Sequence, residues 1–137
     1  MADPLHVEVV AADRLVWQGD ATNVIVRTTE GDIGILSGHE PLLAVLVPCA
    51  AEIVTDDGRR EIVALDGGYI SVNSNQVRLL AQYASLSREI SLERARVELA
   101  ALQKIRDEGD ATDDDVHRLH LATAQVKAAE KQHGHGI

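Results

Sequence analysis

The spacing of hydrophobic residues changes near Ser85, and this change limits the possible folds more than any other feature of the chain. Before Ser85, short segments rich in β-branched residues are separated by turn signals such as Asp57-Gly58 and Gly67-Gly68. After it, hydrophobic residues recur at spacings of three and four, which is the period of an α-helix. The pattern therefore predicts an all-β domain over residues 1–85 and a helical region over residues 86–137.

The first part of the chain contains short apolar or alternating segments between turn residues. Strands at this spacing are typical of an antiparallel sandwich or barrel. We therefore predict an N-terminal sandwich of short antiparallel strands, with a turn at Gly19-Asp20. The predicted strands are Leu5–Val10, Leu15–Trp17, Asn23–Thr28, Ile33–Leu36, Leu43–Leu46, Glu52–Thr55, Glu61–Leu65, Tyr69–Val72 and Val77–Ala81.

Two helices are predicted after the strands. Gly109 predicts the end of the first helix, and Thr112-x-x-Asp115 resembles a capping box that begins the second. Because the connection is short, the helices should form an antiparallel α-helical hairpin. The predicted hydrophobic seams are Leu92, Ala95, Leu99 and Leu102 in the first helix and Val116, Leu119, Thr123 and Val126 in the second.

The hairpin has few large side chains, because alanine and threonine stand where leucine would bury more area. A large aliphatic side chain contributes roughly 1.5–3 kcal/mol on burial, whereas ordering one residue costs roughly 1–2 kcal/mol. We therefore expect a sandwich that folds alone and a regulatory hairpin over residues 86–137 that can detach from it. The segment His133-Gly-His135-Gly predicts a flexible tail.

Composition excludes several classes of protein. The net charge of −9 argues against a nucleic-acid partner, and the three aromatic residues are too few for a base-stacking platform. No apolar run approaches the roughly 18 residues that a membrane span needs, and polar residues interrupt the apolar start that a signal peptide requires. Cys49 is the single cysteine, so a disulfide framework is excluded and a reducing compartment is favoured.

A run of glycines between Glu30 and Leu46 carries the most functional information. The segment reads EGDIGILSGHEPLLAVL. Gly31, Gly34 and Gly38 interrupt an apolar strand pattern at points where turns, bulges or close backbone contacts are expected. The segment resembles the E-G-x-x-G-I-x-P-G-H-x-P-L signature of the epsilon subunit of bacterial F-type ATP synthase.

Two other segments carry the same resemblance, which extends from Leu5 to Lys131. LHVEVVAADRLVWQGDATNVIVRTTEGDIGIL resembles the first hairpin of that family and its continuation. VALDGGYISVNSNQVRLLAQYA resembles the closing strands of the family around a glycine pair. Ser37 departs from the pattern, because the family usually has proline before the glycine at position 38. We expect this turn to be looser but present.

By this resemblance the chain is a non-catalytic rotor subunit that needs no cofactor of its own. In the family, the sandwich attaches to the gamma subunit and rests on the c-ring, while the hairpin either folds on the sandwich or extends along gamma and obstructs rotation during ATP hydrolysis. The resemblance implies a central-stalk protein that helps couple proton flow to ATP synthesis and restrains hydrolysis. It also implies transient contact with beta subunits and a peripheral position on the cytoplasmic face of the bacterial cell membrane.

The resemblance places Asp32, Ser37, Gly38 and His39 in loops that face the c-ring. Ordinary turn chemistry is the alternative, because these residue types are common in such loops. Both interpretations stay open from the sequence.

Several epsilon subunits bind ATP through a motif of the form I/L-D-x-x-R-A. Here Ile90, Arg94 and Ala95 match the motif, and Ser91 replaces its aspartate. Further arginines of the family are absent from the positions where they are expected, which are Ala101, Gln125 and Ala129. Each missing cation removes charge-assisted hydrogen bonds to phosphate. We therefore predict weak ATP binding or none, with Ser91 acting as a helix N-cap.

The hairpin also carries basic residues that could dock to acidic segments of the beta subunit. Acidic residues are interleaved with them at helical spacing, as in Arg94–Glu98 and Lys104–Glu108, so a solvated helix surface is the alternative. The candidates by residue type are Arg94, Arg96, Lys104, Arg106, Arg118, Lys127 and Lys131.

No metal or catalytic site is predicted. His117 and His120 could share a helix face near Asp113 and Asp114, but no further ligand supports a metal centre. Ser37, His39 and Glu40 are nearly adjacent in one turn, where side chains rarely aim at each other as a catalytic triad does. Two other functions stay open from the sequence, namely a small standalone β-domain enzyme and an autonomous ATP-sensing module.

Overall fold

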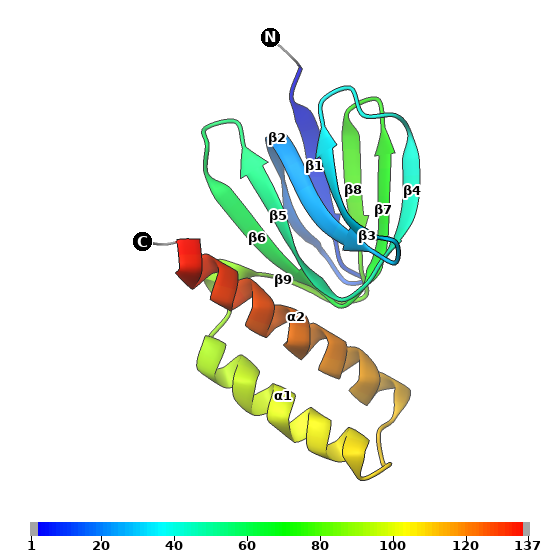
Figure 1. Cartoon of the computed structure of the whole chain (residues 1–137), viewed down its shortest axis with the longest axis vertical. Coiled ribbons are helices and arrows are strands. Elements are labelled where there is room, and N and C mark those ends of the chain that lie inside the picture. The colour runs from blue at the N-terminus through cyan, green and yellow to red at the C-terminus, as the bar shows by residue number, and fades with distance from the viewer. Residues whose placement is uncertain (1–2, 136–137) are drawn as a thin grey trace.

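A computed structural model describes residues 3–135, with side chains described for residues 3–131. Within these residues, nine strands precede a short 3-10 helix and two α-helices (Figure 1). The strands are β1 (Leu5–Val10), β2 (Leu15–Thr28), β3 (Gly31–Leu36), β4 (Leu42–Leu46), β5 (Cys49–Thr55), β6 (Arg60–Leu65), β7 (Gly68–Asn73), β8 (Gln76–Leu80) and β9 (Ala84–Leu86). The helices are η1 (Ser87–Glu89), α1 (Leu92–Asp107) and α2 (Asp113–His135).

The strands form two layers that are joined by β2. Hydrogen-bonded neighbours follow the order β1-β8-β7-β4-β2-β5-β6-β9, with β3 on β2 and a further pairing between β1 and β2. The first half of β2 pairs with β1, and its second half pairs with β3 and β5. The long strand therefore passes from one layer to the other. The predicted sandwich followed by a two-helix hairpin is confirmed.

The turn predicted at Gly19-Asp20 is wrong, because the chain continues there as a single strand. The register of β2 against β5 shifts between Ala21 and Asn23. A bulge of this kind bends a strand without ending it. The polar residues therefore precede the bend at which β2 changes layers.

Two strand pairings differ from the prediction. β1 and β8 are parallel, with Val7 opposite Val77, so the sandwich is not wholly antiparallel. β9 pairs with β6 beyond the last predicted strand, and it carries the sheet to Leu86, past the expected boundary at Ser85. A strand of three residues is too short to show a period of two, and only its partner reveals it.

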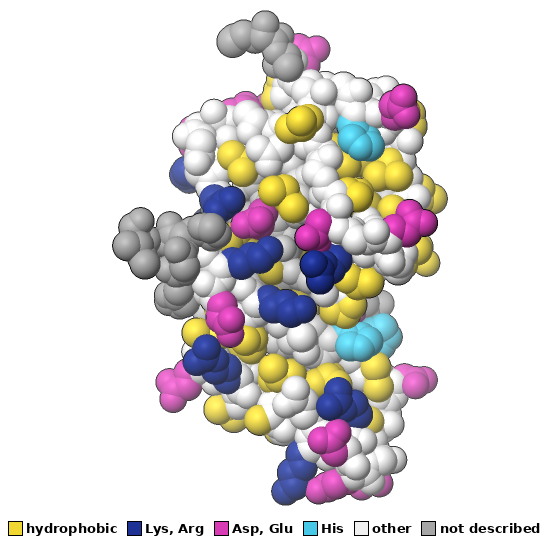
Figure 2. Space-filling view, viewed as in Figure 1, with side chains coloured by type: hydrophobic (Ala, Val, Ile, Leu, Met, Phe, Trp, Pro, Cys, Tyr) yellow, Lys and Arg dark blue, Asp and Glu magenta, His cyan; other side chains and the backbone are white. Residues whose placement is uncertain are grey.

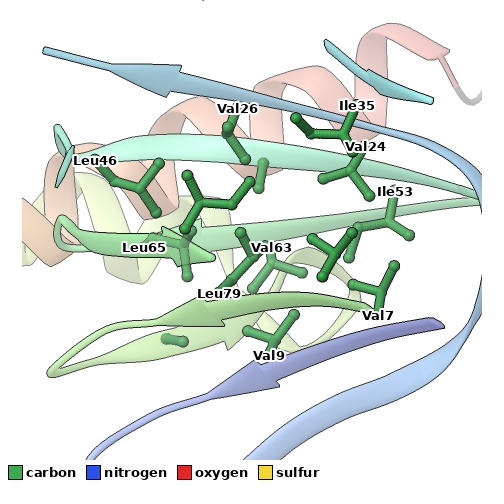
Figure 3. Close-up of a cluster of buried hydrophobic side chains, with 14 of the residues drawn as sticks. Val7, Val9, Val24, Val26, Ile35, Leu46, Ile53, Val63, Leu65 and Leu79 are labelled. Atoms are coloured by element: carbon green, nitrogen blue, oxygen red, sulfur yellow. The ribbon is translucent and has the colours of Figure 1, made fainter. Parts of the chain in front are cut away.

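The main core lies between the two layers. Valine, leucine and isoleucine side chains from β1 and β8 point toward those from β2, β3, β5 and β6 (Figure 3). The largest fully buried side chains in this cluster include Leu5, Ile35, Ile53, Leu65, Ile70 and Leu79. Neither α1 nor α2 contributes a residue to the cluster. The sandwich therefore has a core of its own.

The ends of the helices agree with the predicted signals. The Ser91 hydroxyl accepts a hydrogen bond at 3.4 Å from the backbone N–H three residues later, as an N-cap does. Gly109 has a φ of +79° just after α1, where a left-handed residue ends a helix. The backbone N–H groups of Thr112 and Asp115 each donate to the side chain of the other residue at 3.1 Å. The capping box is thus complete.

The seam between α1 and α2 differs in part from the predicted one. Leu102, Leu119 and Ala122 are buried together, as expected for the two leucines, but Val116 is exposed. α2 continues to His135, so the predicted tail is helical up to that residue. Residues 136–137 of that tail lie outside the described part of the chain.

Candidate functional site

The contact between the hairpin and the sandwich is small and is lined mainly by alanines. α2 lies between the sheet and α1, so one face of α2 covers the sheet (Figure 1). Each buried alanine methyl contributes about 0.8 kcal/mol, against roughly 1.5–3 kcal/mol for a buried leucine. The small alanine side chains therefore let α2 approach the sheet closely, but their burial contributes little to the stability of the docked hairpin. Its buried members are Ala50, Ile62 and Ala64 from the sheet and Ala124 and Ala128 from α2.

The register of the sheet arranges this contact as a row across β5, β6 and β9. Ala50 pairs with Ala64, which pairs with Ser85. At one end of the row, Gln125 Nε2 donates to Ser85 Oγ at 3.2 Å. At the other end, Lys131 Nζ donates to the carbonyl of Ala50 at 3.2 Å. α2 therefore crosses three strands, from the last strand to the fifth.

Sequence reasoning missed this docking face of α2. Ala124 and Ala128 are fully buried and lie four residues apart, whereas Leu119 and Ala122 face α1. The spacing of the two alanines was a signal for a second apolar face. Alanine is too weakly hydrophobic to stand out beside the leucines of the seam.

A buried carboxylate joins the two parts of the chain near the start of α2. The Asp66 side chain is 2% exposed and accepts a hydrogen bond from the Tyr83 backbone N–H at 3.0 Å. His117 Nδ1 lies 3.3 Å from the other Asp66 oxygen, so this histidine faces the sandwich. The Tyr83 hydroxyl donates to Asp114 at 3.3 Å, and the negative charge of Asp114 is the largest cause of a raised pKa for that hydroxyl.

The residues that match the ATP motif do come together. Ile90, Ser91, Arg94 and Ala95 line a cavity of about 270 Å³ between the start of α1 and α2. The other lining residues are Ser85, Glu89, Glu98 and Gln125. Glu98 is paired with Arg118 at 3.0 Å, so the remaining charges of this lining are the carboxylate of Glu89 and the guanidinium of Arg94, and they leave no excess positive charge for a polyphosphate.

At the ATP-motif cavity, ATP is expected to bind with a dissociation constant of about 1 mM or weaker, because this cavity holds a single cation. Isothermal titration calorimetry measures this. If binding is detected, Arg94→Ala should weaken it, and Lys104→Ala on the exposed surface of α1 is the control. A micromolar dissociation constant that depends on Arg94 would contradict the prediction.

Several basic residues of the hairpin pair across the two helices. Arg96 lies 3.4 Å from Glu130, and Arg118 lies 3.0 Å from Glu98. Among the described ion pairs, the expected intrahelical pair between Arg94 and Glu98 is absent, because Glu98 binds α2 instead. These two pairs hold α1 against α2 in the folded hairpin.

The other docking candidates are less engaged. Arg106 lies 3.3 Å from its neighbour Asp107. Within residues 3–131, no ion pair or hydrogen bond of the Lys104 or Lys127 side chain is present. Both ammonium groups are therefore available to acidic partners.

The outer face of β4, β7 and β8 carries an exposed apolar patch. Val45 pairs with Tyr69, which pairs with Leu80, so the three side chains form a row on one face of the sheet. Tyr69 is 52% exposed, and Leu43, two residues before Val45, is 74% exposed. We call Leu43, Val45, Tyr69 and Leu80 the apolar row. A continuous patch of this kind marks an interaction surface.

Comparisons with known proteins agree on the family. Residues 4–87 match the family described as ATP synthase, Delta/Epsilon chain, beta-sandwich domain. The ATP synthase epsilon chain of Cutibacterium acnes is 52% identical over 134 residues, which cover 92% of each chain. That of Streptomyces coelicolor is 46% identical over 94% of this chain and 98% of its own length. The chain belongs to the ATP synthase epsilon chain family.

Solved structures share the fold. A chain of the Euglena gracilis mitochondrial ATP synthase, solved as an OSCP/F1/c-ring assembly, aligns with a TM-score of 0.69 at 23% identity. The alignment covers 96% of this chain and 82% of that one. A chain from the central stalk and c-ring of Tetrahymena thermophila ATP synthase aligns with a TM-score of 0.53 at 14% identity. The predicted membership is confirmed by the curated relatives, and these structures agree on the sandwich and hairpin.

The epsilon signature forms a turn that is tied down by a side chain. Gly38 has a φ of +83°, and its N–H donates to Asn75 Oδ1 at 2.8 Å. Asn75 Nδ2 donates to Ser37 Oγ at 3.2 Å. The serine that replaces the usual proline thus gains a partner on the β7–β8 turn. These bonds restrain a turn that was expected to be looser.

The four ring-facing candidates lie at the two opposite ends of β3. Asp32 lies at the start of β3, where Arg27 Nε donates to it at 2.9 Å. Ser37, Gly38 and His39 follow the other end of β3. A strand rises about 3.3 Å per residue, so the two ends of β3 are far apart.

An epsilon chain is a non-catalytic subunit, and the geometry of the signature turn agrees. His39 Nδ1 lies 2.7 Å from the carbonyl oxygen of Glu40, Ser37 Oγ accepts from Asn75, and among the described residues no hydrogen bond joins His39 to Ser37. No group of metal-binding side chains is present among the residues that the structure describes. No described helix combines the length and the apolar composition that crossing a bilayer requires.

Proposed function

We propose that this epsilon chain is a central-stalk rotor subunit whose sandwich anchors it to the gamma subunit and the c-ring, and whose hairpin restrains ATP hydrolysis. The subunit helps couple proton flow to ATP synthesis. The observation that carries the proposal is the separation of two packing units. The sandwich has a complete core without the helices, and the hairpin docks on it through an alanine-lined contact.

Extension of the hairpin changes the partners of its cations. Separating α1 from α2 breaks the pairs of Arg96 with Glu130 and of Arg118 with Glu98. The freed guanidinium groups, together with Lys104 and the other docking candidates, can then bind an acidic segment of a beta subunit. In the extended form, these cations exchange their partners within the hairpin for acidic partners on beta. The electrostatic free energies of the docked and extended forms therefore differ little, so both forms can be populated.

The apolar row supports attachment to the gamma subunit. Its four side chains lie on the outer face of β4, β7 and β8, whereas the hairpin covers β5, β6 and β9. A partner on this row therefore does not compete with the docked hairpin. Aromatic and aliphatic side chains at the centre of an interface contribute most of its binding energy.

Tyr69→Glu is expected to weaken gamma binding about tenfold or more, because it places a charge in the centre of the apolar row. Binding to purified gamma measured by surface plasmon resonance tests this. Val97→Glu is the matched control, since Val97 is 67% exposed on α1 and lies outside the row. Normal gamma binding by a folded Tyr69→Glu chain would show that gamma attaches elsewhere.

The ring contact is assigned to the Asp32 end of β3. Arg27 is the main cause of a lowered pKa for Asp32, so this carboxylate stays charged and can meet the polar loops of a membrane ring. In this orientation the subunit is peripheral on the cytoplasmic face of the cell membrane.

Cysteine cross-linking distinguishes the two ends of β3. In a Cys49→Ser background, Asp32→Cys is expected to cross-link to a cysteine in the ring loops of the assembled enzyme. His39→Cys, from the far end of the strand, is the control and should not cross-link. The reverse pattern would move the ring contact to the signature turn.

A further inference from the structure

A second cavity, of about 610 Å³, lies between the last part of α2 and the sheet. It faces the side of α2 that carries Lys127 and Lys131, whereas the ATP-motif cavity faces the side with Gln125. Lys and Arg side chains gather on the surface where α2 meets the sheet (Figure 2). Apolar residues from β2 and β5, including Ile25 and Ala50, also line the cavity.

Three cations converge on this cavity from both parts of the chain. Arg27 comes from β2, and Lys127 and Lys131 come from α2. Burial raises the pKa of the Cys49 thiol in the same cavity, and the positive charges of all three cations oppose that rise. The positive charges of all three cations therefore act on the same group, the Cys49 thiol, although the net charge of the whole chain is −9.

Two carboxylates in the lining are already neutralised. Asp32 accepts hydrogen bonds from Arg27 at 2.9 and 3.4 Å. Glu130 lies 3.4 Å from Arg96 of α1. The cationic partners therefore reduce the repulsion that these two carboxylates exert on a bound anion.

The third carboxylate is shared by two cations. Glu52 lies 3.5 Å from Arg60 and 3.8 Å from Lys131. When the ion-pair partners Arg60 and Arg96 are included, five cationic side chains accompany three carboxylates. Lys127 has no ion pair or hydrogen bond with any described residue, so its ammonium group is free to bind a ligand.

We propose that this cavity binds a small phosphate-bearing molecule, with the phosphate between Arg27, Lys127 and Lys131. Phosphate oxygens accept charge-assisted hydrogen bonds from guanidinium and ammonium groups. The volume lies in the range of small-molecule sites, and the apolar lining accommodates a ring or an alkyl group attached to the phosphate. Inorganic pyrophosphate and a nucleotide such as ADP share this chemistry.

Binding links the hairpin to the sandwich. Arg27 belongs to the sheet, whereas both lysines belong to α2, so the anion bridges the two packing units. A ligand that binds one form more tightly shifts the equilibrium toward that form. The ligand therefore stabilises the docked hairpin from the side opposite to the ATP-motif cavity.

Titration of the full-length chain with pyrophosphate and, separately, with ADP tests the proposal by amide NMR. We expect shifts centred on Cys49, Lys127 and Lys131, with a dissociation constant of about 1 mM or tighter for at least one of the two. Pyrophosphate binding would show that the phosphate is sufficient. Binding of ADP alone would show that the apolar lining is also needed, and either result supports the site.

Lys127→Gln should weaken this binding about tenfold, and because the Lys127 side chain makes no ion pair or hydrogen bond with any described residue, the variant should fold and dock normally. Lys104→Gln on α1 and Arg94→Gln in the other cavity are controls that should bind like the wild type. The proposal is overturned if neither anion binds, if binding survives Lys127→Gln, or if the shifts centre on Ile90 to Ala95.

Discussion

Removing residues 90–137 is expected to raise ATP hydrolysis by the assembled ATP synthase roughly fivefold or more, with assembly unchanged. The shortened chain keeps β9 and η1, and it loses no side chain of the main core. It also keeps the apolar row and the Asp32 end of β3, which we assign to gamma and the ring. Only the hairpin, which we propose obstructs rotation, is absent.

Hydrolysis rates and subunit composition of the purified complex measure this result. Cooperative thermal unfolding of the shortened chain by itself shows that the sandwich is intact. Hydrolysis at the wild-type rate in a fully assembled complex would show that the hairpin does not restrain this enzyme.

Locking the hairpin on the sandwich should raise hydrolysis in the same way, because the extended form can no longer arise. Ala64 and Ala124 are the positions for a cysteine pair, in a Cys49→Ser background that prevents exchange. Both are fully buried in the docking cluster, and Ala124 precedes Gln125, which bonds the strand neighbour of Ala64. Reduction of the disulfide should restore the wild-type rate, which makes each sample its own control.

Ala124→Glu should have the opposite effect. A carboxylate at this fully buried position has no partner in the cluster, so the docked form loses stability while the sandwich core is untouched. The extended form becomes more populated, and hydrolysis falls. Ala100→Glu, at an exposed position of α1, is the matched control. Equal rates for both variants would show that docking does not control hydrolysis.

Gly68→Ala is expected to destabilise the sandwich by about 2–5 kcal/mol, from left-handed strain of about 1–2 and overpacking of about 1–3. Gly68 has a φ of +115°, and an added Cβ would lie 1.9 Å from the Leu80 carbonyl oxygen. That oxygen belongs to the β7–β8 ladder and cannot move aside without breaking strand pairing. This close approach explains the second glycine of the pair that the family resemblance singled out.

Gly58→Ala is the matched control for this variant. Gly58 has a φ of +83°, but no atom lies within 4 Å of an added Cβ, so only the backbone strain of about 1–2 kcal/mol applies. Urea denaturation of both variants measures the difference between them. Equal losses of stability would mean that the β7–β8 ladder relaxes around a methyl group.

Most of the fold could be predicted because its signals are local. The period of two before Ser85 and the helical period after it indicated the two parts, and the helix caps at Ser91, Gly109 and Thr112 were correct. The parallel pairing of β1 with β8 left no such signal, because it joins strands from opposite ends of the sandwich sequence. The three residues of β9 also carried no recognisable strand pattern, because only their pairing with β6 shows that they form a strand.

The candidate sites could also be predicted only where their signals are local. The sequence showed which residues of the ATP motif are present, and local chemistry was enough to predict a weak site. Which carboxylates enter that cavity depends on packing, since Glu89 and Glu98 line it only when α1 lies beside α2. The resemblance placed the ring-facing candidates in loops that face one ring, but β3 lies between Asp32 and His39 and separates them.

The sequence by itself determined the family, the sandwich and the hairpin, because a local period and a glycine signature do not depend on distant contacts. Only the tertiary structure decided where the hairpin docks and which charges meet there. Ala124 reaches the row of Ala50 and Ala64, and Lys127 reaches the cavity beside Arg27, through contacts between residues distant in the chain. The sheet register and the path of α2 bring such residues together, and no pattern within one segment encodes those contacts.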